Sequence, residues 1–589
     1  MMKISDNGRI RVWCDFEVEC QLRVQGEDSN IRTTCAEFQF IRTEENRNGG
    51  TIRLEFSFPA TDISGRWFPV CRFDRSIKAD YDAAVESMTA ISAPVVCFYN
   101  ANGENRYTIA LSEVCQKTVI KCGIHEEDGT MSCVVEFPVI QASCGCEYTV
   151  TIRESMEKKP YWEVLDNVRC WWEDTLKIIP ADIPDIARKP MYSFWYSKHQ
   201  NITAEIVEEE SLLAAEMGFS SVIVDDGWQT DDNHRGYAFC GDWKPSAQKF
   251  PDFPEHIARV QKMGLKYLLW FSVPYIGKKS EAWKKFHDKI LRYDESQQAG
   301  IFDLRYPEVR DYLKGIYVKA VKDWNLDGLK LDFIDEFYFR EDSPAYNDKM
   351  DCSDIQAALN VFLTDITETL KSIRPDILIE FRQRYIGPQI RRYGNILRVN
   401  DCPGSAISNR VGTIDLRLLS GNTAVHSDML MWHPDENPED AALQILSCLF
   451  ATVQISVCLD KITEKMKKML LFWTEFMRKN EKLLLMSKIQ PLEPENLYPE
   501  VCTEYAEEKL LVHYSKGRIA DLRNIDEKLY FIHAAKTAEV CFRCRVTDTL
   551  SYVILDCYGE KMQCGVIQDQ EWICLYIPTA GMVAFKRMV

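Results

Sequence analysis

The 589-residue chain contains no uninterrupted apolar run of about 18 residues, so its sequence predicts no membrane-spanning helix. Its first residues, Met1 to Arg9, turn polar at once and hold no apolar signal core, which predicts an unsecreted, cytoplasmic protein. Basic residues are also in deficit: 71 Lys and Arg stand against 89 Asp and Glu, giving a formal charge of −18. Nucleic acid and anionic membranes are therefore not expected as partners, because binding phosphate groups requires a basic surface.

The sequence carries no convincing metal or cofactor motif. Its 22 cysteines stand without a secretion signal, so we expect reduced thiols and not a disulfide framework. Cys541 and Cys544 form a CxxC pair, but they lie in a strand-like stretch, where positions three apart face opposite sides. No dinucleotide glycine fingerprint and no His-x-His strand end appear, and His426 and Asp428 are the only close His/Asp pair at a predicted strand end. We therefore expect no cofactor and no metal.

Patterning divides the chain into three parts, which we place at residues 1–178, 179–490 and 491–589. The first ~175 residues indicate β structure, because runs such as Thr51 to Phe58, Met131 to Phe137 and Tyr148 to Arg153 alternate apolar and polar residues with a period of two. The last ~95 residues return to short β runs, among them Leu510 to Tyr514 and Trp572 to Ile577. We expect an N-terminal β-sandwich and a small C-terminal β-sandwich around a different central part.

The central part alternates between strand and helix. Eight strand signals occur, each followed by a helical or loop segment; they are Met191 to Ser197, Phe219 to Val224, Lys266 to Pro274, Gly328 to Asp332, Asp376 to Phe381, Ile396 to Asn400, Ala424 to Met429 and Gln454 to Leu459. A final helix over 462–485 places Met466, Leu470, Trp473 and Met477 on one stripe. Eight such units predict a (β/α)8 TIM barrel, a fold whose active site lies where the strands end.

Many side chains at these strand ends suit carbohydrate chemistry. Two acids stand out: Asp332 ends the fourth strand and Asp401 follows the sixth. A barrel brings such strand ends together, and a pair of carboxylates across one bond is how glycosides are cleaved. The other candidates are Asp225, Asp226, Trp228, Trp243, Trp270, Lys330, Arg382 and Arg398, and such acids, cations and aromatic faces suit sugar hydroxyls and C–H faces. Taken singly, Asp225 or Asp226 is more often a helix cap, and each tryptophan is more often a packing residue.

Four motifs in order give the chain a resemblance to glycoside hydrolase family 36, the α-galactosidases and their raffinose-synthase-like relatives. They are Val222-Ile-Val-Asp-Asp-Gly-Trp-Gln, Gly241-Asp-Trp-Lys-Pro-Ser-Ala-Gln-Lys-Phe-Pro-Asp, Gly264-Leu-Lys-Tyr-Leu-Leu-Trp-Phe and Gly328-Leu-Lys-Leu-Asp. The resemblance spans roughly residues 190–460, and the order sandwich, barrel, sandwich also resembles that family. It implies a retaining, exo-acting α-galactosidase that acts on an oligosaccharide or other glycoside; an assembly of several copies is possible by analogy.

The resemblance also implies roles for individual residues. Asp332 would be the nucleophile and would stay ionised beside Lys330, while Asp401 would be the acid/base and would need a raised pKa. Asp225 and Asp226 would accept hydrogen bonds from the O4 and O6 hydroxyls of the sugar. Lys330 would bind neighbouring hydroxyls, and the tryptophans at 228, 243 and 270 would shape the pocket.

The chain departs from the family pattern after the fifth strand, where the family has a cysteine and a glycine-rich turn. Here Arg382 and Arg384 follow Glu380, and they would either meet an anionic substituent or neutralise the surrounding acids; we favour neutralisation. An α-N-acetylgalactosaminidase, an α-glucosidase and a raffinose-synthase-like transglycosylase therefore remain alternatives. A carbohydrate-binding protein without catalysis is disfavoured by the presence of both Asp332 and Asp401.

Overall fold

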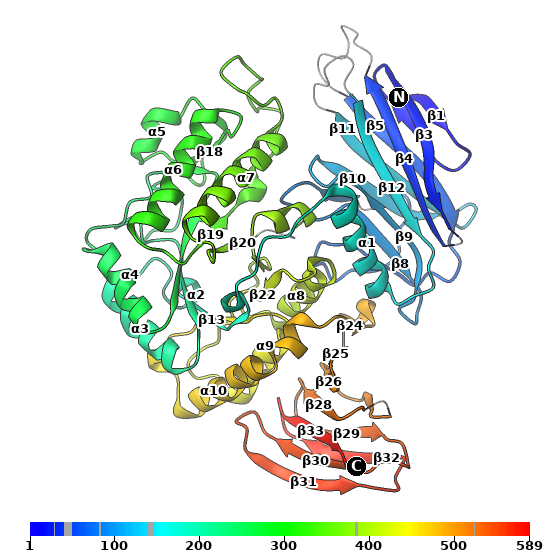
Figure 1. The fold of residues 1–589 in the computed structure, drawn as a ribbon, viewed down its shortest axis with the longest axis vertical. Helices are drawn as coiled ribbons and strands as arrows, with labels where there is room; N and C mark the ends of the chain where they lie inside the picture. The colour runs from blue at the N-terminus through cyan, green and yellow to red at the C-terminus, as the bar shows by residue number, and fades with distance from the viewer. Residues whose placement is uncertain are drawn as a thin grey trace.

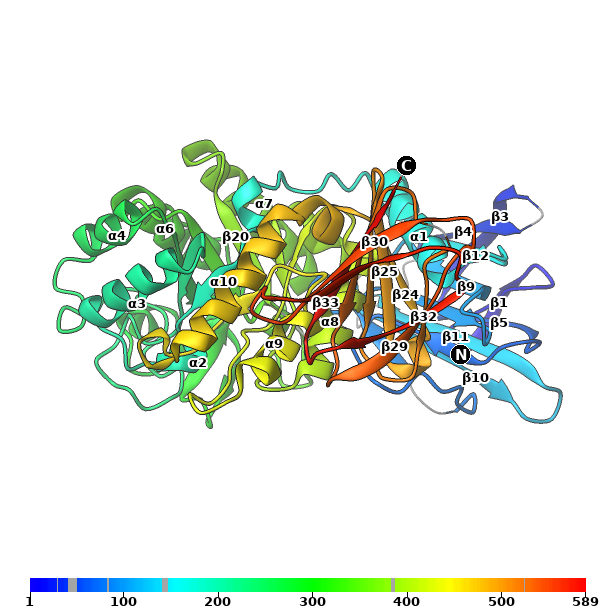
Figure 2. The same cartoon turned by 90° about the horizontal axis from the view of Figure 1, so that it is seen from below.

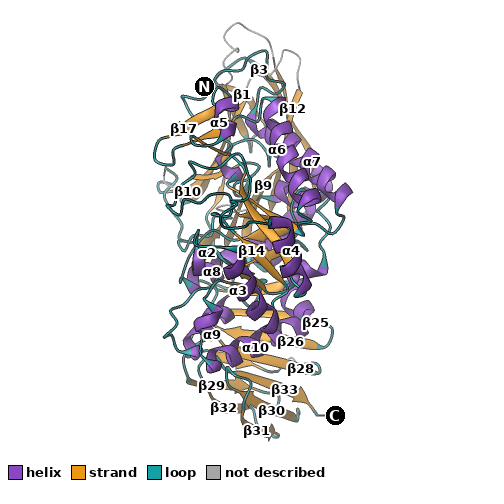
Figure 3. Cartoon of the chain, turned by 90° about the vertical axis from the view of Figure 1, so that its left-hand side faces the viewer, coloured by secondary structure: helices purple, strands orange, loops and turns teal. Residues whose placement is uncertain are grey.

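The computed structural model describes residues 1–28, 30–40, 50–81, 84–139, 147–382, 387–523 and 525–588. Two strand-rich parts flank a central barrel with helices around it (Figure 1), and Figure 3 shows most helices in the middle of the molecule, with the C-terminal strands at one end. The predicted order of a β-sandwich, a TIM barrel and a smaller β part is confirmed. The divisions at 178 and 490 stay predictions.

The N-terminal part packs two six-stranded antiparallel sheets face to face around an apolar core. One sheet has the order β1 (Met2–Asp6), β2 (Arg11–Cys14), β5 (Gly50–Pro59), β11 (Thr130–Val139), β10 (Thr118–His125) and β7 (Ala84–Ser87). The other has the order β3 (Val18–Glu27), β4 (Ile31–Phe40), β12 (Glu147–Ser155), β9 (Asn105–Leu111), β8 (Val95–Tyr99) and β6 (Gly65–Trp67). Period-two alternation predicted this arrangement because strands such as β5 have one buried face, whereas β8 is buried at every position.

One expectation for this part is wrong. The chain from Tyr161 to Leu176 is not β but helix α1. Its buried residues Val164, Leu165, Val168 and Trp172 recur every three to four positions, which is the spacing of one helical face. From that face the Trp172 indole donates to the carbonyl of Leu111 in the sandwich at 2.7 Å, and the Tyr161 hydroxyl donates to the carbonyl of Pro491 at 2.8 Å. The helix also contacts α8 (Ala406–Ser420) of the barrel. Helix α1 therefore belongs to the junction of the three parts.

The central sheet is an eight-stranded parallel barrel. Its strands are β13 (Met191–Ser193), β14 (Ser221–Val224), β15 (Lys266–Ser272), β19 (Gly328–Asp332), β20 (Leu378–Arg382), β21 (Ile396–Arg398), β22 (Ala424–His426) and β23 (Gln454–Ile455). All eight match the predicted strands, whose near-continuous apolar runs suit a sheet buried on both faces. Strand β23 pairs with β13, and single bridges from His426 to Thr452 and from Leu430 to Ile455 close the ring.

The strand register lines up the polar strand ends. Asp332 pairs across β19 and β20 with Arg382, which in turn pairs with Arg398 on β21. Their side chains therefore leave neighbouring strands at the same height. The helices of the barrel are α2 (Trp195–Lys198), α3 (Ala204–Glu216), α4 (Phe253–Lys262), α5 (Glu281–Phe286), α6 (Pro307–Asp323), α7 (Ile355–Ile373), α8 (Ala406–Ser420), α9 (Pro438–Ser447) and α10 (Glu464–Lys479). The predicted apolar stripe of α10 is buried, as expected.

The sequence did not indicate a small sheet inserted in the barrel. Strands β16 (Tyr275–Gly277), β17 (Ile290–Asp294) and β18 (Ala299–Phe302) form it between β15 and α6. It lies just beyond the end of β15, and Tyr275 from it stacks on Tyr237 with ring centres 4.5 Å apart. The insertion therefore contributes to the wall beside the ends of the barrel strands.

The C-terminal part lies against helices α9 and α10, as Figures 1 and 2 both show. One sheet has the order β24 (Ile489–Leu492), β25 (Glu500–Tyr505), β26 (Glu508–His513), β28 (Lys528–His533), β33 (Met582–Arg587), β30 (Leu550–Leu555) and β31 (Lys561–Ile567). The second consists of β27 (Ile519–Asp521), β29 (Ala538–Arg543) and β32 (Trp572–Ile577). Contrary to the expectation of reduced thiols, Cys541 and Cys574 form a disulfide, because they are directly opposite each other on β29 and β32.

Candidate active site

Asp332 is held from three sides at the end of β19. The indole nitrogen of Trp270, from the neighbouring strand β15, donates to its Oδ2 at 2.9 Å, and the backbone N–H of Phe333 donates to its Oδ1 at 2.8 Å. Arg382 Nε lies 3.2 Å from the same Oδ1. The contacting cation is therefore Arg382, and not Lys330 as expected. These contacts fix the rotamer of a carboxylate that is only 4% exposed.

Asp401 lies beyond the end of β21, beside two arginines. Arg398 donates to its Oδ1 at 2.8 Å, and Arg382 Nε lies 3.8 Å from that oxygen. One arginine nitrogen therefore contacts both Asp332 and Asp401. The separation of the two contacted oxygens cannot exceed the sum of the two contact distances, so both carboxylates face one small volume. The side chain of Asp401 is still 41% exposed and remains open to solvent.

The expectation of a raised pKa for Asp401 is wrong. Partial burial tends to raise that pKa, but the positive charges of Arg398 and Arg382 outweigh burial and hold it below the ordinary value of an aspartate. Asp401 is therefore ionised while both arginines are in place. Arg382 behaves as predicted for a residue that neutralises the surrounding acids. Its predicted companion Arg384 lies outside the described residues.

The prediction that Arg398 binds the substrate is wrong, because its side chain is buried among carboxylates. It is 1% exposed, and besides Asp401 it contacts Asp428 Oδ1 at 2.5 Å and Glu380 Oε1 at 3.6 Å. Burial disfavours the charged guanidinium, but the surrounding carboxylates prevail and raise its pKa well above the ordinary value. Arg398 is a positioning residue that fixes Asp401 against the barrel.

Asp225 and Asp226, both from the end of β14, are buried in different environments. Lys330 donates to both oxygens of Asp225, at 3.1 and 2.8 Å. Burial raises the pKa of Asp225, and the Lys330 charge opposes the rise. Asp226 accepts from Gln200 at 2.6 Å and from Gln229 at 2.7 Å, and burial raises its pKa to about 6. The pair thus offers one salt-bridged and one amide-bound carboxylate.

The three predicted tryptophans divide into one site residue and two packing residues. Trp270 touches Asp332, as described above. Trp228 is fully buried, stacks on Phe253 with ring centres 5.7 Å apart, and donates to the backbone carbonyl of Trp270 at 2.9 Å. Trp243 packs edge-on against Trp270 at 5.7 Å and is 2% exposed. Trp228 and Trp243 therefore support Trp270 from behind and do not form a pocket surface.

Several residues of this network were not among the predicted site residues. Gln200 follows the first strand and bonds Asp226; Lys249 donates to the carbonyls of Gln200 and Gly227 at 2.8 and 2.7 Å and so fixes the turn that carries Asp226. Tyr196 donates to Asp428 at 3.0 Å. Tyr196 and Gln200 could have been predicted as site residues, because they follow the first barrel strand, β13. Lys249 lies in the second motif, but the sequence did not show that it contacts two backbone carbonyls and the side chain of Asn233.

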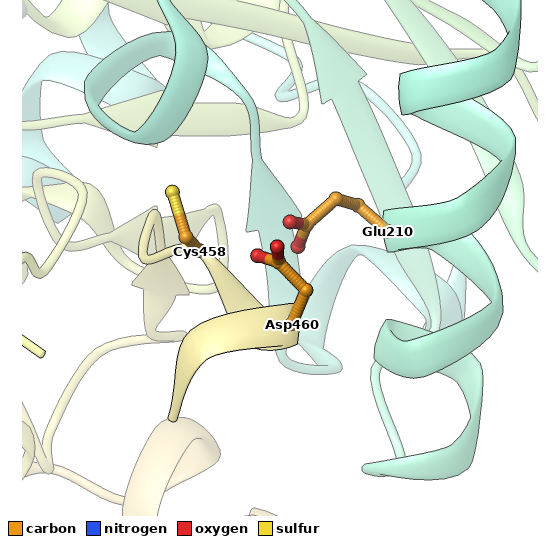
Figure 4. Close-up of side chains that lie close together, drawn as sticks. All are labelled: Glu210, Cys458 and Asp460. Atoms are coloured by element: carbon orange, nitrogen blue, oxygen red, sulfur yellow. The ribbon is translucent and has the colours of Figure 1, made fainter. Parts of the chain in front are cut away.

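A separate cluster of possible metal ligands does not include Asp332 or Asp401. Ligand atoms of Glu210, Cys458 and Asp460 lie within 4.8 Å of one another, and the two carboxylates point toward each other (Figure 4). Lys198 Nζ, however, donates to Glu210 at 2.7 Å and lies 3.8 Å from Asp460. The lysine already supplies the positive charge that these acids need, so the donor set does not fit a metal.

Comparisons with known proteins agree with this architecture. The Melibiase family profile matches residues 186–383. The α-galactosidase AgaA of Geobacillus stearothermophilus is 27% identical over 137 residues, which are 22% of this chain and 18% of the relative. The bifunctional α-galactosidase/sucrose kinase AgaSK of Mediterraneibacter gnavus is 25% identical over 202 residues, 33% of this chain and 20% of the relative. The chain thus aligns with about a fifth of the length of these curated relatives.

Similarity of fold extends much further than similarity of sequence. The crystal structure of AgaA, a GH36 α-galactosidase, superimposes with a TM-score of 0.66 over 100% of this chain and 86% of that one, at 15% identity. An AgaA variant has also been solved in complex with stachyose. An α-xylosidase of Emericella nidulans is 31% identical over 117 residues, 18% of this chain and 15% of the relative.

Among the described residues, no helix has both the length and the apolar character that crossing a membrane requires. The family resemblance indicated by the four motifs is confirmed: residues 186–383 match the Melibiase family profile, and the chain has the fold of the glycoside hydrolase family 36 α-galactosidases.

Proposed function

We propose that the protein is a retaining exo-α-galactosidase with Asp332 as nucleophile and Asp401 as acid/base. The observation that carries the proposal is the shared contact of Arg382 Nε, 3.2 Å from Asp332 and 3.8 Å from Asp401. The limit these distances set includes the about 5–5.5 Å separation of retaining glycosidases and excludes most of the about 6.5–9.5 Å range of inverting ones. Galactose is proposed as the sugar because the similar proteins are named α-galactosidases.

The geometry supports a double displacement. Asp332 attacks the anomeric carbon while Asp401 gives its proton to the leaving oxygen, so that a covalent glycosyl ester forms and the alcohol departs. Asp401 then takes a proton from water, which attacks the anomeric carbon and releases Asp332. The hydrogen bonds from Trp270 and the Phe333 backbone N–H keep Asp332 oriented, and they stabilise it as a leaving group in the second step.

Arg382 must move for this cycle to begin. Its guanidinium contacts both carboxylates, so it occupies space that the reacting atoms need. It also helps to keep the pKa of Asp401 low, whereas the first step needs a protonated Asp401. A sugar that binds here and displaces Arg382 would place its glycosidic bond between the two carboxylates. The loss of the Arg382 charge would also allow Asp401 to hold a proton.

The buried acids of β14 fit the recognition of sugar hydroxyls. Asp225 and Lys330 form a buried donor–acceptor pair, and Asp226 lies next to them. Carboxylates accept strong hydrogen bonds from hydroxyls, so this cluster would select the O4 and O6 positions. A sugar epimer whose hydroxyl points elsewhere would leave a buried carboxylate without its hydrogen-bond partner, which is costly in free energy. Such a site therefore discriminates between epimers.

An α-xylosidase is the second candidate. The similarity to the Emericella nidulans α-xylosidase favours it. Xylose lacks the C6 hydroxymethyl group, so an enzyme for xylosides would use Asp226 differently. A side-by-side assay of 4-nitrophenyl α-galactoside, α-xyloside, α-N-acetylgalactosaminide and α-glucoside separates the candidates. We expect the galactoside to give the highest kcat/KM; a preference for any other sugar would replace the proposed specificity.

The role of Asp332 is tested by removing it. Asp332→Ala should abolish turnover of the preferred aryl glycoside, because no nucleophile remains. Azide should restore part of the activity and give a glycosyl azide of the opposite anomeric configuration to the substrate. The matched control is Asp335→Ala, three residues along the chain, which should not respond to azide. Retention of substantial activity by Asp332→Ala would exclude Asp332 as nucleophile.

The role of Asp401 is tested by varying the leaving group. Asp401→Ala should lower kcat/KM by at least about 100-fold for a disaccharide, which needs proton donation, but far less for a 4-nitrophenyl glycoside, which does not. Equal losses on both substrates would remove Asp401 from the acid/base role.

A further inference from the structure

A cavity of about 1000 Å³ lies between the N-terminal sandwich and the barrel, and we propose that it binds the leaving group of the substrate. The chemistry of its walls assigns that leaving group to one class: an alcohol with an extended apolar body and a few hydroxyl groups, such as a polyphenol. This inference rests on the proposed glycosidase function and specifies its substrate.

The position of Asp401 places the leaving group in this cavity. Asp401 and its neighbours Asn400 and Cys402 form part of the wall, whereas Asp332, Lys330 and Asp225 do not. The acid/base must reach the oxygen that joins the sugar to the leaving group. The sugar therefore belongs on the side of Asp332 and the leaving group on the side of the cavity, with Asp401 between them.

The walls favour an apolar body. From the sandwich come Val70, Val85, Met88 and Ile91, and the barrel contributes Ile355. Ligand sites of about 300–1,000 Å³ hold drug-sized molecules, so the cavity exceeds the needs of one sugar ring. A disaccharide would bring hydroxyls around its whole rim against these methyl groups, and only the hydroxyls near Arg72, Glu86 and Lys117 would regain polar partners. A fused or linked ring system would not bring hydroxyls around its whole rim.

Two buried oxygens provide the specific polar contacts. Among the described residues, Asp354 Oδ1 and Gln356 Oε1 have no hydrogen-bond partner, although their residues are only 9% and 5% exposed and both line the cavity. Their other polar atoms are occupied: Asp354 Oδ2 accepts from Gln116 and from the backbone of Ala357, and Gln356 Nε2 donates to the carbonyl of Phe337. Buried acceptors are normally satisfied, so this pair calls for ligand hydroxyl donors.

The first test measures binding without catalysis. Naringenin, a flavanone with phenolic hydroxyls, is titrated into the full-length protein by calorimetry, with sucrose as the disaccharide comparison. We expect naringenin to bind and sucrose to bind at least tenfold more weakly. Failure of naringenin to bind, or tighter binding of sucrose, would overturn the assignment whatever the enzyme hydrolyses.

The second test locates the binding. Asp354→Asn keeps a good helix N-cap for α7 but replaces the free acceptor by an N–H donor, and Val70→Trp fills the cavity from a half-buried position. Each should weaken naringenin binding at least tenfold. The control is Asp365→Asn on the same helix, where the exposed carboxylate contacts Lys314 and should not affect binding. Unchanged affinity in both cavity variants would place naringenin elsewhere and refute the proposal.

The third test connects binding to turnover. The ratio of kcat/KM for naringenin 7-α-galactoside to that for methyl α-galactoside should fall at least tenfold in Asp354→Asn and in Val70→Trp. Equal changes on both substrates would contradict a leaving-group role for the cavity. Absence of hydrolysis of every glycoside would refute the proposed function instead, and the calorimetric result would still decide whether the cavity binds such alcohols.

Discussion

The charge neighbours of a carboxylate, more than its place in the fold, determine what it does here. Asp332 ends β19, Asp401 lies just beyond β21, and both contact Arg382, yet Asp401 has a second arginine, Arg398, at 2.8 Å. Asp428 contacts the same Arg398, but deeper burial raises its pKa. In the proposed mechanism, Asp401 can therefore hold the proton that it donates only when one of its cations leaves. Arg398 is anchored by Asp401, Asp428 and Glu380, so Arg382 is the cation that can move.

Substitution of Arg382 should change the pH dependence of activity. In Arg382→Gln one positive charge next to Asp401 is lost, so the pKa of Asp401 should rise, and the basic limb of kcat/KM should move to higher pH by on the order of one unit. The profile is measured with an unactivated disaccharide, whose cleavage needs the proton. Arg392→Gln, whose guanidinium bonds backbone carbonyls of residues 176 and 177, is the control and should leave the limb in place. A basic limb that does not respond to Arg382→Gln would contradict the role of Asp401.

His426 should make stability depend on pH. Burial lowers its pKa to about 4, against about 6.5 in an unfolded chain. Between these values the unfolded state binds more protons, so stability falls as pH falls from about 6.5 to about 4. From pH 7 to pH 5 this group should cost about 2 kcal/mol. His426→Gln should remove that cost, so calorimetry should show a smaller loss of Tm between pH 7 and pH 5 than in the wild type. An identical loss in both proteins would show that His426 does not titrate as proposed.

At the scale of elements, the strands were predictable and the contacts between them were not. Parallel barrel strands are buried on both faces, so the apolar run of β15 or β19 indicated a strand and its last polar residue indicated a site. Pairing partners depend on neighbours distant in sequence, and nothing in the sequence showed that Lys330 bonds Asp225 while Arg382 bonds Asp332. Helix α1 was missed because it lies between strand patterns.

The turn after β14 offers a test at this scale. Gly227 has φ +109°, and a Cβ there would lie 2.6 Å from Gln200 Cα. Gly227→Ala should therefore push Gln200 away from Asp226 and lower kcat/KM at least tenfold. Gly264→Ala is the matched control, because Gly264 also has positive φ (+88°) but open space around its Cβ position. It should cost stability, by about 1 kcal/mol or more, and leave kcat/KM unchanged. Equal kinetic effects of the two substitutions would mean that backbone strain, and not the clash, is responsible.

At the scale of the whole molecule, a buried polar cluster joins the three parts. Asp415 on helix α8 of the barrel accepts from Trp67 at 3.0 Å and from Arg75 at 2.6 Å, both in the N-terminal part. It also accepts from Tyr498, between β24 and β25 of the C-terminal part, at 2.5 Å. The side chains of Arg75 and Asp415 are 1% and 0% exposed. A barrel without its flanking parts would expose this carboxylate, and loss of the N-terminal part would also open the cavity beside Asp401.

The cluster should behave as one unit when it is mutated. Asp415→Leu leaves the buried Arg75 without its carboxylate and should destabilise the protein by about 3–5 kcal/mol, whereas adding Arg75→Met should recover much of that loss, because the uncompensated charge is then gone. Calorimetric unfolding of the two single variants and the double variant measures the coupling. Strict additivity would mean that the two side chains do not depend on each other. If the cluster does couple the parts, the single variants should also split the unfolding transition, since the sandwich and the barrel would then lose their structure at different temperatures.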